Sequence, residues 1–115
     1  FANEFWVLAE DTDAYLLVAN WPAKRRHHWQ TLARARAIEN QAYFVAVNRV
    51  GRDGAVDADG QRTGQLDHCG DSMVVDPLGE VLVHAAGTET TIFADIDTDH
   101  VASTRAHFKF LQDRR

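Results

Sequence analysis

The chain has 115 residues, enough for one domain with a single hydrophobic core. Its formal net charge of −5, from 17 acidic and 12 basic residues, argues against a general polyanion-binding protein. No apolar run approaches the roughly 20 residues that span a bilayer. The single cysteine, Cys69, cannot form an intrachain disulfide, which fits a reducing compartment. We therefore expect a cytoplasmic protein that binds neither nucleic acid nor membrane.

The first half of the sequence predicts a β-α-β unit after a short helical start at residues 1–10. The continuous apolar runs Tyr15–Ala19 and Tyr43–Val47 are typical of strands that are covered on both faces. Between them a helix is expected from about Lys24 to Gln41, because Ala, Leu, Arg and Gln are good helix formers. Spacings of three and four residues place four apolar side chains on one face of this helix: Leu32, Ala35, Ile38 and Ala42.

The second half predicts a long loop followed by an antiparallel meander. Gly51 to Asp67 is rich in Gly and Asp and almost free of apolar residues, so we expect an exposed loop. Strands are expected at Ser72–Val75 and Val81–His84, joined by a type I turn at Asp76–Gly79. Alternating apolar residues predict a third strand from Thr90 to Asp95.

Two local side-chain interactions are also predicted. Arg36 and Glu39 lie three residues apart on the expected helix, where an ion pair can form. Asp97 is expected to cap a short last helix. One side of that helix carries Val101, Arg105 and Phe108.

Three basic residues, Lys24, Arg25 and Arg26, lie at the start of the long helix. Cations are slightly unfavourable there, because a helix N-terminus carries partial positive charge. One interpretation is that a carboxylate or another anion lies nearby, held by a guanidinium fork and free main-chain N–H groups. The alternative is that these side chains extend into solvent or pair with acidic residues such as Asp11 and Asp13.

The other candidates for chemistry are weaker. No two histidines have a zinc-motif spacing, and His27 and His28 diverge by about 100° on a helix, so no metal site is expected. Cys69 follows His68, and a nearby imidazole can activate a thiol as a nucleophile. Catalytic pairs are usually assembled by the fold, however, so a structural thiol at the start of a strand is the favoured interpretation. Asn48 closes a buried strand, and strand ends often line sites.

Two stretches resemble the nitrilase superfamily of carbon–nitrogen hydrolases. The pattern NWPxxRxxHWxxLxRARAIENQAYxxAVNRVG begins at Asn20, and GDSMVVDPLGEVL begins at Gly70. The nearest match is the ω-amidase branch, which hydrolyses the terminal amide of 2-oxoacid amides. The resemblance extends from Tyr15 to about Phe110, nearly the whole chain. It implies an α/β fold, the C-terminal half of a nitrilase-type α-β-β-α sandwich.

The resemblance also implies a Glu–Lys–Cys triad, in which the Cys attacks the amide carbon, the Glu is the general base and the Lys stabilises the oxyanion. None of the three can be placed in this chain. Phe1 matches the end of the family's nucleophile motif, so the nucleophile is expected upstream, and Cys69 matches a different position. Residues 1–115 are therefore expected to form a partial carbon–nitrogen hydrolase domain that lacks the catalytic triad and is inactive alone.

What the resemblance carries over is substrate binding. Asn20, Trp21 and Pro22 match a loop that borders the pocket in relatives, and Arg25 and His28 match the pattern that follows. Arg25 is then the candidate that binds the carboxylate of a small amide substrate. The resemblance implies no cofactor, and it implies a homodimer. The alternative function is a truncated, non-catalytic domain that acts only in self-association or partner binding.

Overall fold

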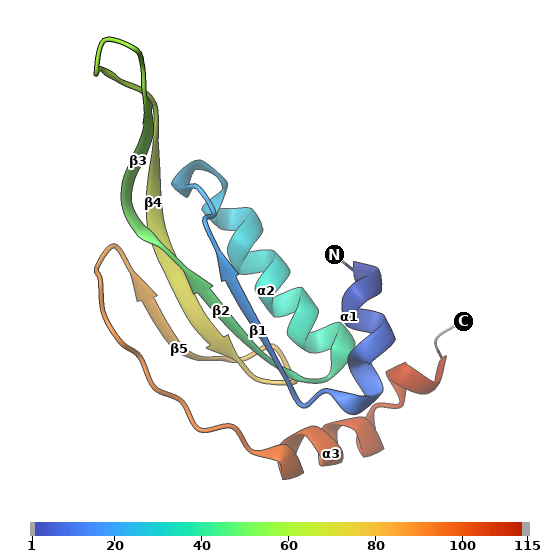
Figure 1. Ribbon diagram of the computed structural model, residues 1–115. Helices are drawn as coiled ribbons and strands as arrows, with labels where there is room; N and C mark the ends of the chain where they lie inside the picture. The colour runs from blue at the N-terminus through green and yellow to red at the C-terminus, as the bar shows by residue number, and fades with distance from the viewer. Residues whose placement is uncertain (1, 114–115) are drawn as a thin grey trace.

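The computed structural model describes residues 2–113. Phe1, which carries the match to the nucleophile motif, lies outside the described residues. The chain folds into a mixed sheet with helices packed against it (Figure 1). The elements, in chain order, are α1 (Ala2–Leu8), β1 (Ala14–Ala19), α2 (Arg26–Asn40), β2 (Tyr43–Asn48), β3 (Val50–Val56), β4 (Arg62–Val75), β5 (Val81–Ala86) and α3 (Thr98–His107).

Strands β1 and β2 form a parallel pair, and α2 is the crossover between them. Their register runs from Ala14 opposite Tyr43 to Ala19 opposite Asn48. Both strands are apolar on two faces, as strands of parallel pairs commonly are. The predicted β-α-β unit is therefore confirmed.

Helix α2 is close to its predicted bounds, but its buried face differs from the prediction. A 3₁₀ turn, η2 (Ala23–Arg25), precedes it, and Gln41 ends it in the left-handed conformation with φ of 49°. Leu32 and Ile38 are 43% and 42% exposed, so the predicted apolar face is not the face that α2 buries. The buried side chains follow a four, four and three spacing: Trp29, Ala33, Ala37 and Asn40. Alanine at two of these positions lets the helix backbone approach the sheet closely.

The predicted loop from Gly51 to Asp67 is wrong, because β3 and the first half of β4 form an antiparallel hairpin there. This two-stranded ribbon projects away from the rest of the molecule (Figure 1). Its residues lack a hydrophobic pattern, but main-chain bonds and cross-strand ion pairs do not require one. Arg52 Nε lies 2.7 Å from Asp67 Oδ1 on the opposite strand.

Strand β4 changes partners along its length. Its first half pairs with β3, and its second half lies between β2 and β5. The change occurs at Gly70 and Asp71, whose φ angles of 75° and 56° both lie in the left-handed region. The predicted strands at Ser72–Val75 and Val81–His84 lie within β4 and β5, and are confirmed.

The turn between β4 and β5 also follows the prediction. The N–H of Gly79 donates to the main-chain oxygen of Asp76 over 2.9 Å. The carboxylate of Asp76 additionally accepts the N–H of Leu78 at 2.9 Å. Asp at the first position and Gly at the fourth therefore act as this turn type requires.

The strand predicted at Thr90–Asp95 is wrong, because this segment pairs with no strand of the described chain. It instead forms an extended connection from β5 to α3 (Figure 1). Helix α3 itself is confirmed, and the carboxylate of Asp97 accepts the N–H of Asp99 at 2.9 Å as its cap.

The two faces of the sheet are covered unequally. The main core lies between the sheet and α2, with Phe5 of α1 packed against it. On the opposite face α3 covers only one end, where Val101 packs with Tyr43 and Val74. Leu16 and Val18 of β1 also point to that side and are 71% and 72% exposed. Among the described strands β1 pairs only with β2, so its other edge is open.

Candidate functional site

The carboxyl ends of the parallel strands β1 and β2 lie at the same edge of the sheet, because Ala19 is opposite Asn48. In open α/β sheets, ligands bind outside the carboxyl ends of parallel strands. The segment from Asn20 to Arg25 leaves β1 at this edge and leads into α2. It is therefore the part of the chain best placed to meet a small molecule.

Trp21 and Arg25 contact each other in this segment. The indole Nε1 donates to the main-chain oxygen of Arg25 at 2.7 Å. The guanidinium carbon of Arg25 lies 5.0 Å from the centre of the indole ring, in a cation–π arrangement. Within the described chain, no Asp or Glu forms an ion pair with Arg25. Its positive charge is exposed and available to an anion.

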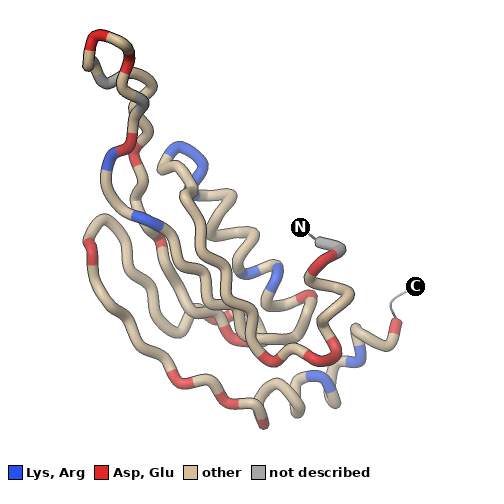
Figure 2. Tube along the Cα trace, viewed as in Figure 1, with Lys and Arg blue, Asp and Glu red and all other residues tan. Residues whose placement is uncertain are grey.

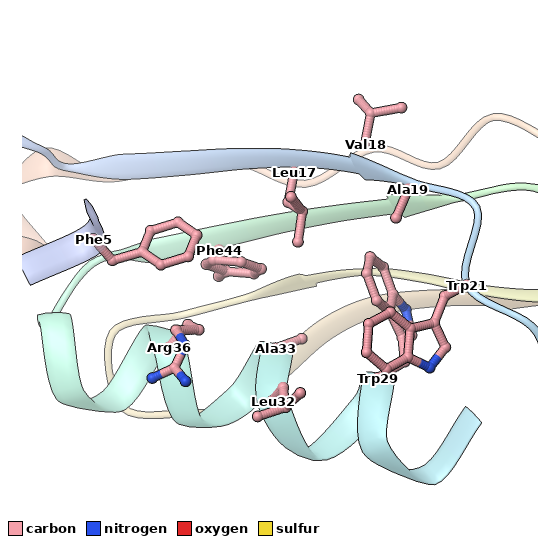
Figure 3. A pocket seen from close by; sticks show the side chains of 10 residues that line it. All are labelled: Phe5, Leu17, Val18, Ala19, Trp21, Trp29, Leu32, Ala33, Arg36 and Phe44. Carbon is pink, nitrogen blue, oxygen red and sulfur yellow. The ribbon is translucent and has the colours of Figure 1, made fainter. Parts of the chain in front are cut away.

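A largely apolar cavity of about 430 Å³ lies beside Trp21, between β1 and α2 (Figure 3). Leu17, Ala19 and Phe44 point into it from the strands, and Trp29 stands next to Trp21 at a ring distance of 5.9 Å. Of the described residues that line it, Arg36 alone is charged, and Arg36 forms the predicted ion pair with Glu39. The cavity thus offers shape and apolar surface but no free charge.

The other predicted site residues divide into two groups. Pro22 is buried, and its main-chain oxygen accepts the N–H of Arg25 at 3.0 Å, so it belongs with Trp21 and Arg25. Asn20 is exposed directly after β1. His28 is exposed on α2, with its ring 6.2 Å from that of His27, and it does not line the cavity.

The cluster of basic residues before α2 (Figure 2) is partly explained by an internal acid. Arg26 Nη2 lies 2.8 Å from Asp71 Oδ1, so one of the three cations pairs with a carboxylate 45 residues away. Asp13, one of the acids expected to pair with this cluster, instead lies 3.8 Å from Arg105.

Asp71 joins three elements through its buried carboxylate. Besides Arg26 of α2, it is hydrogen-bonded to His84 Nε2 of β5 at 2.9 Å and to Cys69 Sγ of its own strand at 3.2 Å. Burial by itself raises the pKa of Asp71, but the hydrogen bonds from Cys69, Arg26 and His84 outweigh it and leave this pKa below its usual value. The carboxylate is therefore ionised at neutral pH and holds the start of α2 against the sheet.

Cys69 does not have the surroundings of a nucleophile. Burial raises the pKa of its thiol, and the hydrogen bond to Asp71 and the charge of that carboxylate raise it further. The thiol is therefore protonated at neutral pH and acts as a hydrogen-bond donor. It lies in the middle of β4, not at the start of a strand as predicted.

Two absences apply to residues 2–113. No group of three or more His, Cys, Asp or Glu side chains is arranged so that it could hold a metal ion. No helix in the same residues is long and apolar enough to cross a membrane.

Comparison with known proteins identifies the family. The family model described as carbon-nitrogen hydrolase matches residues 1–106. The chain belongs to the carbon–nitrogen hydrolase family. It is 43% identical to omega-amidase YafV of Escherichia coli over 104 residues, which are 90% of this chain and 37% of that protein. It is 38% identical to the 2-oxoglutaramate amidase of Paenarthrobacter nicotinovorans over 109 residues, which are 95% of this chain and 34% of that protein.

Solved structures of carbon–nitrogen hydrolases share the fold. A CN-hydrolase superfamily protein of Xanthomonas campestris superposes with a TM-score of 0.77 at 41% identity, covering 91% of this chain and 36% of that one. A carbon-nitrogen hydrolase of Helicobacter pylori has a TM-score of 0.84 at 27% identity, covering 100% and 42%. The α/β sandwich fold of the nitrilase superfamily is thus confirmed, and the chain spans little more than a third of the curated relatives that it matches.

Proposed function

We propose that this chain is the C-terminal part of an amidase that hydrolyses the terminal amide of a small, carboxylate-bearing substrate of the 2-oxoacid amide class. The names of the curated relatives support this substrate class. In this proposal the Glu–Lys–Cys triad lies on upstream chain, and the residues described above form one wall of the substrate site. A Cys nucleophile attacks the amide carbon and releases ammonia, and water then hydrolyses the thioester.

The observation that carries the proposal is the placement of Arg25. Its guanidinium is stacked on Trp21 at the carboxyl ends of β1 and β2, with no acidic partner in the described chain. Arginine suits this role because its planar fork matches the two oxygens of a carboxylate. Stacking on an aromatic face restricts the side chain, so less entropy is lost when an anion binds.

The outer edge of β1 and the sheet face that carries Leu16 and Val18 support the proposal that further chain lies upstream. Strands of parallel pairs are normally covered on both faces, yet in residues 2–113 Leu16 and Val18 are exposed and no strand pairs with the outer edge of β1. Further chain of the length that relatives possess would cover these surfaces.

We further propose that the amidase is a cytoplasmic homodimer. Outside its buried face, α2 carries the exposed apolar residues Leu32, which borders the cavity, and Ile38, and exposed apolar side chains of this kind are common on a helix in a subunit interface. The single unpaired cysteine fits a reducing compartment. Sedimentation of the longest polypeptide that contains this chain tests the dimer, and a monomer at micromolar concentration would contradict it.

Arg25→Ala in that polypeptide tests the substrate site. We expect KM for a carboxylate-bearing amide to rise about tenfold, since a charge-assisted hydrogen bond contributes roughly 1.5–3 kcal/mol. KM for a neutral amide of similar size should change much less. Lys24→Ala, which removes a neighbouring exposed cation, is the matched control. Equal effects of Arg25→Ala on both substrates would remove Arg25 from the site.

A further inference from the structure

Asn48, the last residue of β2, has a side chain that bonds to both main-chain groups of Trp21. Its Oδ1 accepts the N–H of Trp21 at 2.7 Å, and its Nδ2 donates to the oxygen of Trp21 at 3.1 Å. The same Nδ2 donates to the oxygen of Gly70 at 2.7 Å. Asn48 is only 7% exposed, so these bonds form away from solvent. The side-chain amide thus takes the place of a peptide group in a neighbouring strand.

These bonds extend the sheet beyond its last main-chain contacts. The register of β1 and β2 ends with Ala19 opposite Asn48, followed by one bond from the N–H of Arg49 to the oxygen of Ala19. Trp21 lies past this point. Within the described chain, the main-chain N–H and the main-chain oxygen of Trp21 are both hydrogen-bonded to the Asn48 side chain. Asn48 therefore determines where the loop leaves the sheet.

The position of Trp21 in turn determines that of Arg25. The indole N–H is bonded to the Arg25 oxygen, and its ring lies under the guanidinium. The N–H of Arg25 also donates to the oxygen of Pro22, which follows Trp21 directly. A continuous set of contacts therefore runs from Asn48 through Trp21 to Arg25.

The side chain of Asn48 is not needed to hold its own strand. The main-chain N–H and oxygen of Asn48 are both bonded to the hydroxyl of Ser72, at 2.9 and 3.1 Å. Asn40, another buried asparagine, differs in that its Nδ2 bonds within its own helix, to the oxygen of Arg36 at 2.8 Å. The Asn48 amide, by contrast, bonds only to the loop and to Gly70 among the residues that the structure describes.

We propose that Asn48 is a positioning residue, which fixes Trp21 and through it holds Arg25 in the orientation that binds the substrate carboxylate. The substrate part of this inference rests on the proposed function, whereas the anchoring of Trp21 does not. Asn48→Ala leaves only a methyl group as the side chain and so removes all three hydrogen bonds of the amide. Asn48→Asp keeps an acceptor for the N–H of Trp21, but sets a second oxygen against the carbonyl oxygens of Trp21 and Gly70.

The test combines a structural and a kinetic measurement on the longest polypeptide that contains this chain. Hydrogen exchange of the Trp21 main-chain N–H reports directly on its bond to Asn48. We expect exchange to become about tenfold faster in Asn48→Ala, as loss of one buried hydrogen bond implies. KM for a carboxylate-bearing amide should rise several-fold more than KM for a neutral amide. Asn40→Ala is the matched control. In this variant the exchange rate of the Trp21 N–H, divided by that of the strand amides, should stay unchanged.

The outcomes separate the two proposals. Unchanged exchange of Trp21 in Asn48→Ala would overturn the anchoring role, whatever the substrate. Faster exchange with equal effects on both substrates would overturn the link between this loop and the carboxylate, and with it the role of Arg25 in the proposed function. If Asn48→Ala does not fold, Asn48→Asp decides by the same two measurements: repulsion between its second oxygen and the carbonyl oxygens of Trp21 and Gly70 should displace the loop, so faster exchange of the Trp21 N–H and the selective rise in KM are expected again.

Discussion

The indole N–H of Trp29 donates to the main-chain oxygen of Asp71 at 2.8 Å, and so joins α2 to β4 at the residue where β4 changes partners. The carboxylate of the same Asp71 binds Arg26, three residues before Trp29 on α2. One aspartate therefore holds the start of the helix through both its side chain and its main chain. The loop that carries Trp21 and Arg25 leads directly into this part of α2.

Trp29→Phe should destabilise the fold by about 1–3 kcal/mol, because it leaves the buried oxygen of Asp71 without its donor and leaves a small void. The free energy of unfolding from urea denaturation measures this. Trp6→Phe, at an exposed position on α1, is the matched control and should change stability by less than about 0.5 kcal/mol. Equal effects of the two substitutions would contradict a structural role for the Trp29 bond.

Asp71→Asn should cost about 2 kcal/mol at pH 7, since hydrogen bonds to a charged group are lost. The pKa of Asp71 is lowered in the folded state, so its contribution is present above the ordinary carboxyl pKa of about 3.9 and is lost as pH falls through the folded-state value. The difference between wild type and variant should therefore shrink below about pH 4. Asp59→Asn, at the exposed tip of the hairpin, should show no such difference. A difference independent of pH would contradict the account.

Cys69 should react slowly with iodoacetamide at pH 7, because its pKa is raised and the thiol is protonated. Asp71→Asn removes the negative charge that favours the protonated thiol, and it replaces one of the two acceptor oxygens with an NH2 group that can donate to a thiolate. The pH midpoint of alkylation should then fall, and this shift is measured by mass spectrometry across a pH series. A midpoint already below that of a free thiol in the wild type would show an activated cysteine instead.

Gly79→Ala should destabilise the fold by about 2 kcal/mol, from the left-handed backbone and from the shift that it forces on the Ile38 side chain. At Gly79 φ is +86°, a backbone angle that residues with a side chain rarely adopt. An added Cβ would lie 2.6 Å from Cδ1 of Ile38 on α2. Gly60→Ala is the matched control, because φ is +76° there but nothing lies within 4 Å of the added carbon. It should cost only about 1 kcal/mol. Thermal unfolding of the two variants separates the clash from the backbone strain, and equal losses would show that the turn does not pack on α2 as described.

The parts of the fold that local sequence patterns determine were predictable. Continuous apolar runs predicted β1 and β2, and Asp and Gly at fixed turn positions predicted the turn at Asp76. The β3–β4 hairpin was not predictable from apolar periodicity, since it is held by main-chain bonds and by pairs such as Arg52 with Asp67. The segment after Thr90 has the alternation of a strand but has no partner strand in the described chain.

The candidate site was predictable only in part. The resemblance indicated Trp21 and Arg25, which do lie together. The side chains that anchor this segment and the start of α2 are distant in sequence. Asn48 lies 27 residues from its partner Trp21, and Asp71 lies 45 residues from its partner Arg26. Neither side chain carries a local signal for its partner, because contacts of this kind arise only when the sheet has formed.

The proposed function requires that residues 1–115 form a wall of the substrate site and that the nucleophile lies upstream of them. The most direct measurement compares amide hydrolysis by the longest polypeptide that contains this chain with hydrolysis by its Cys69→Ala variant, with residues 1–115 alone as a third sample. We expect the longest polypeptide and its Cys69→Ala variant to hydrolyse a carboxylate-bearing amide at the same rate, and residues 1–115 alone to have no activity. Activity of residues 1–115 alone that Cys69→Ala abolishes would contradict this expectation.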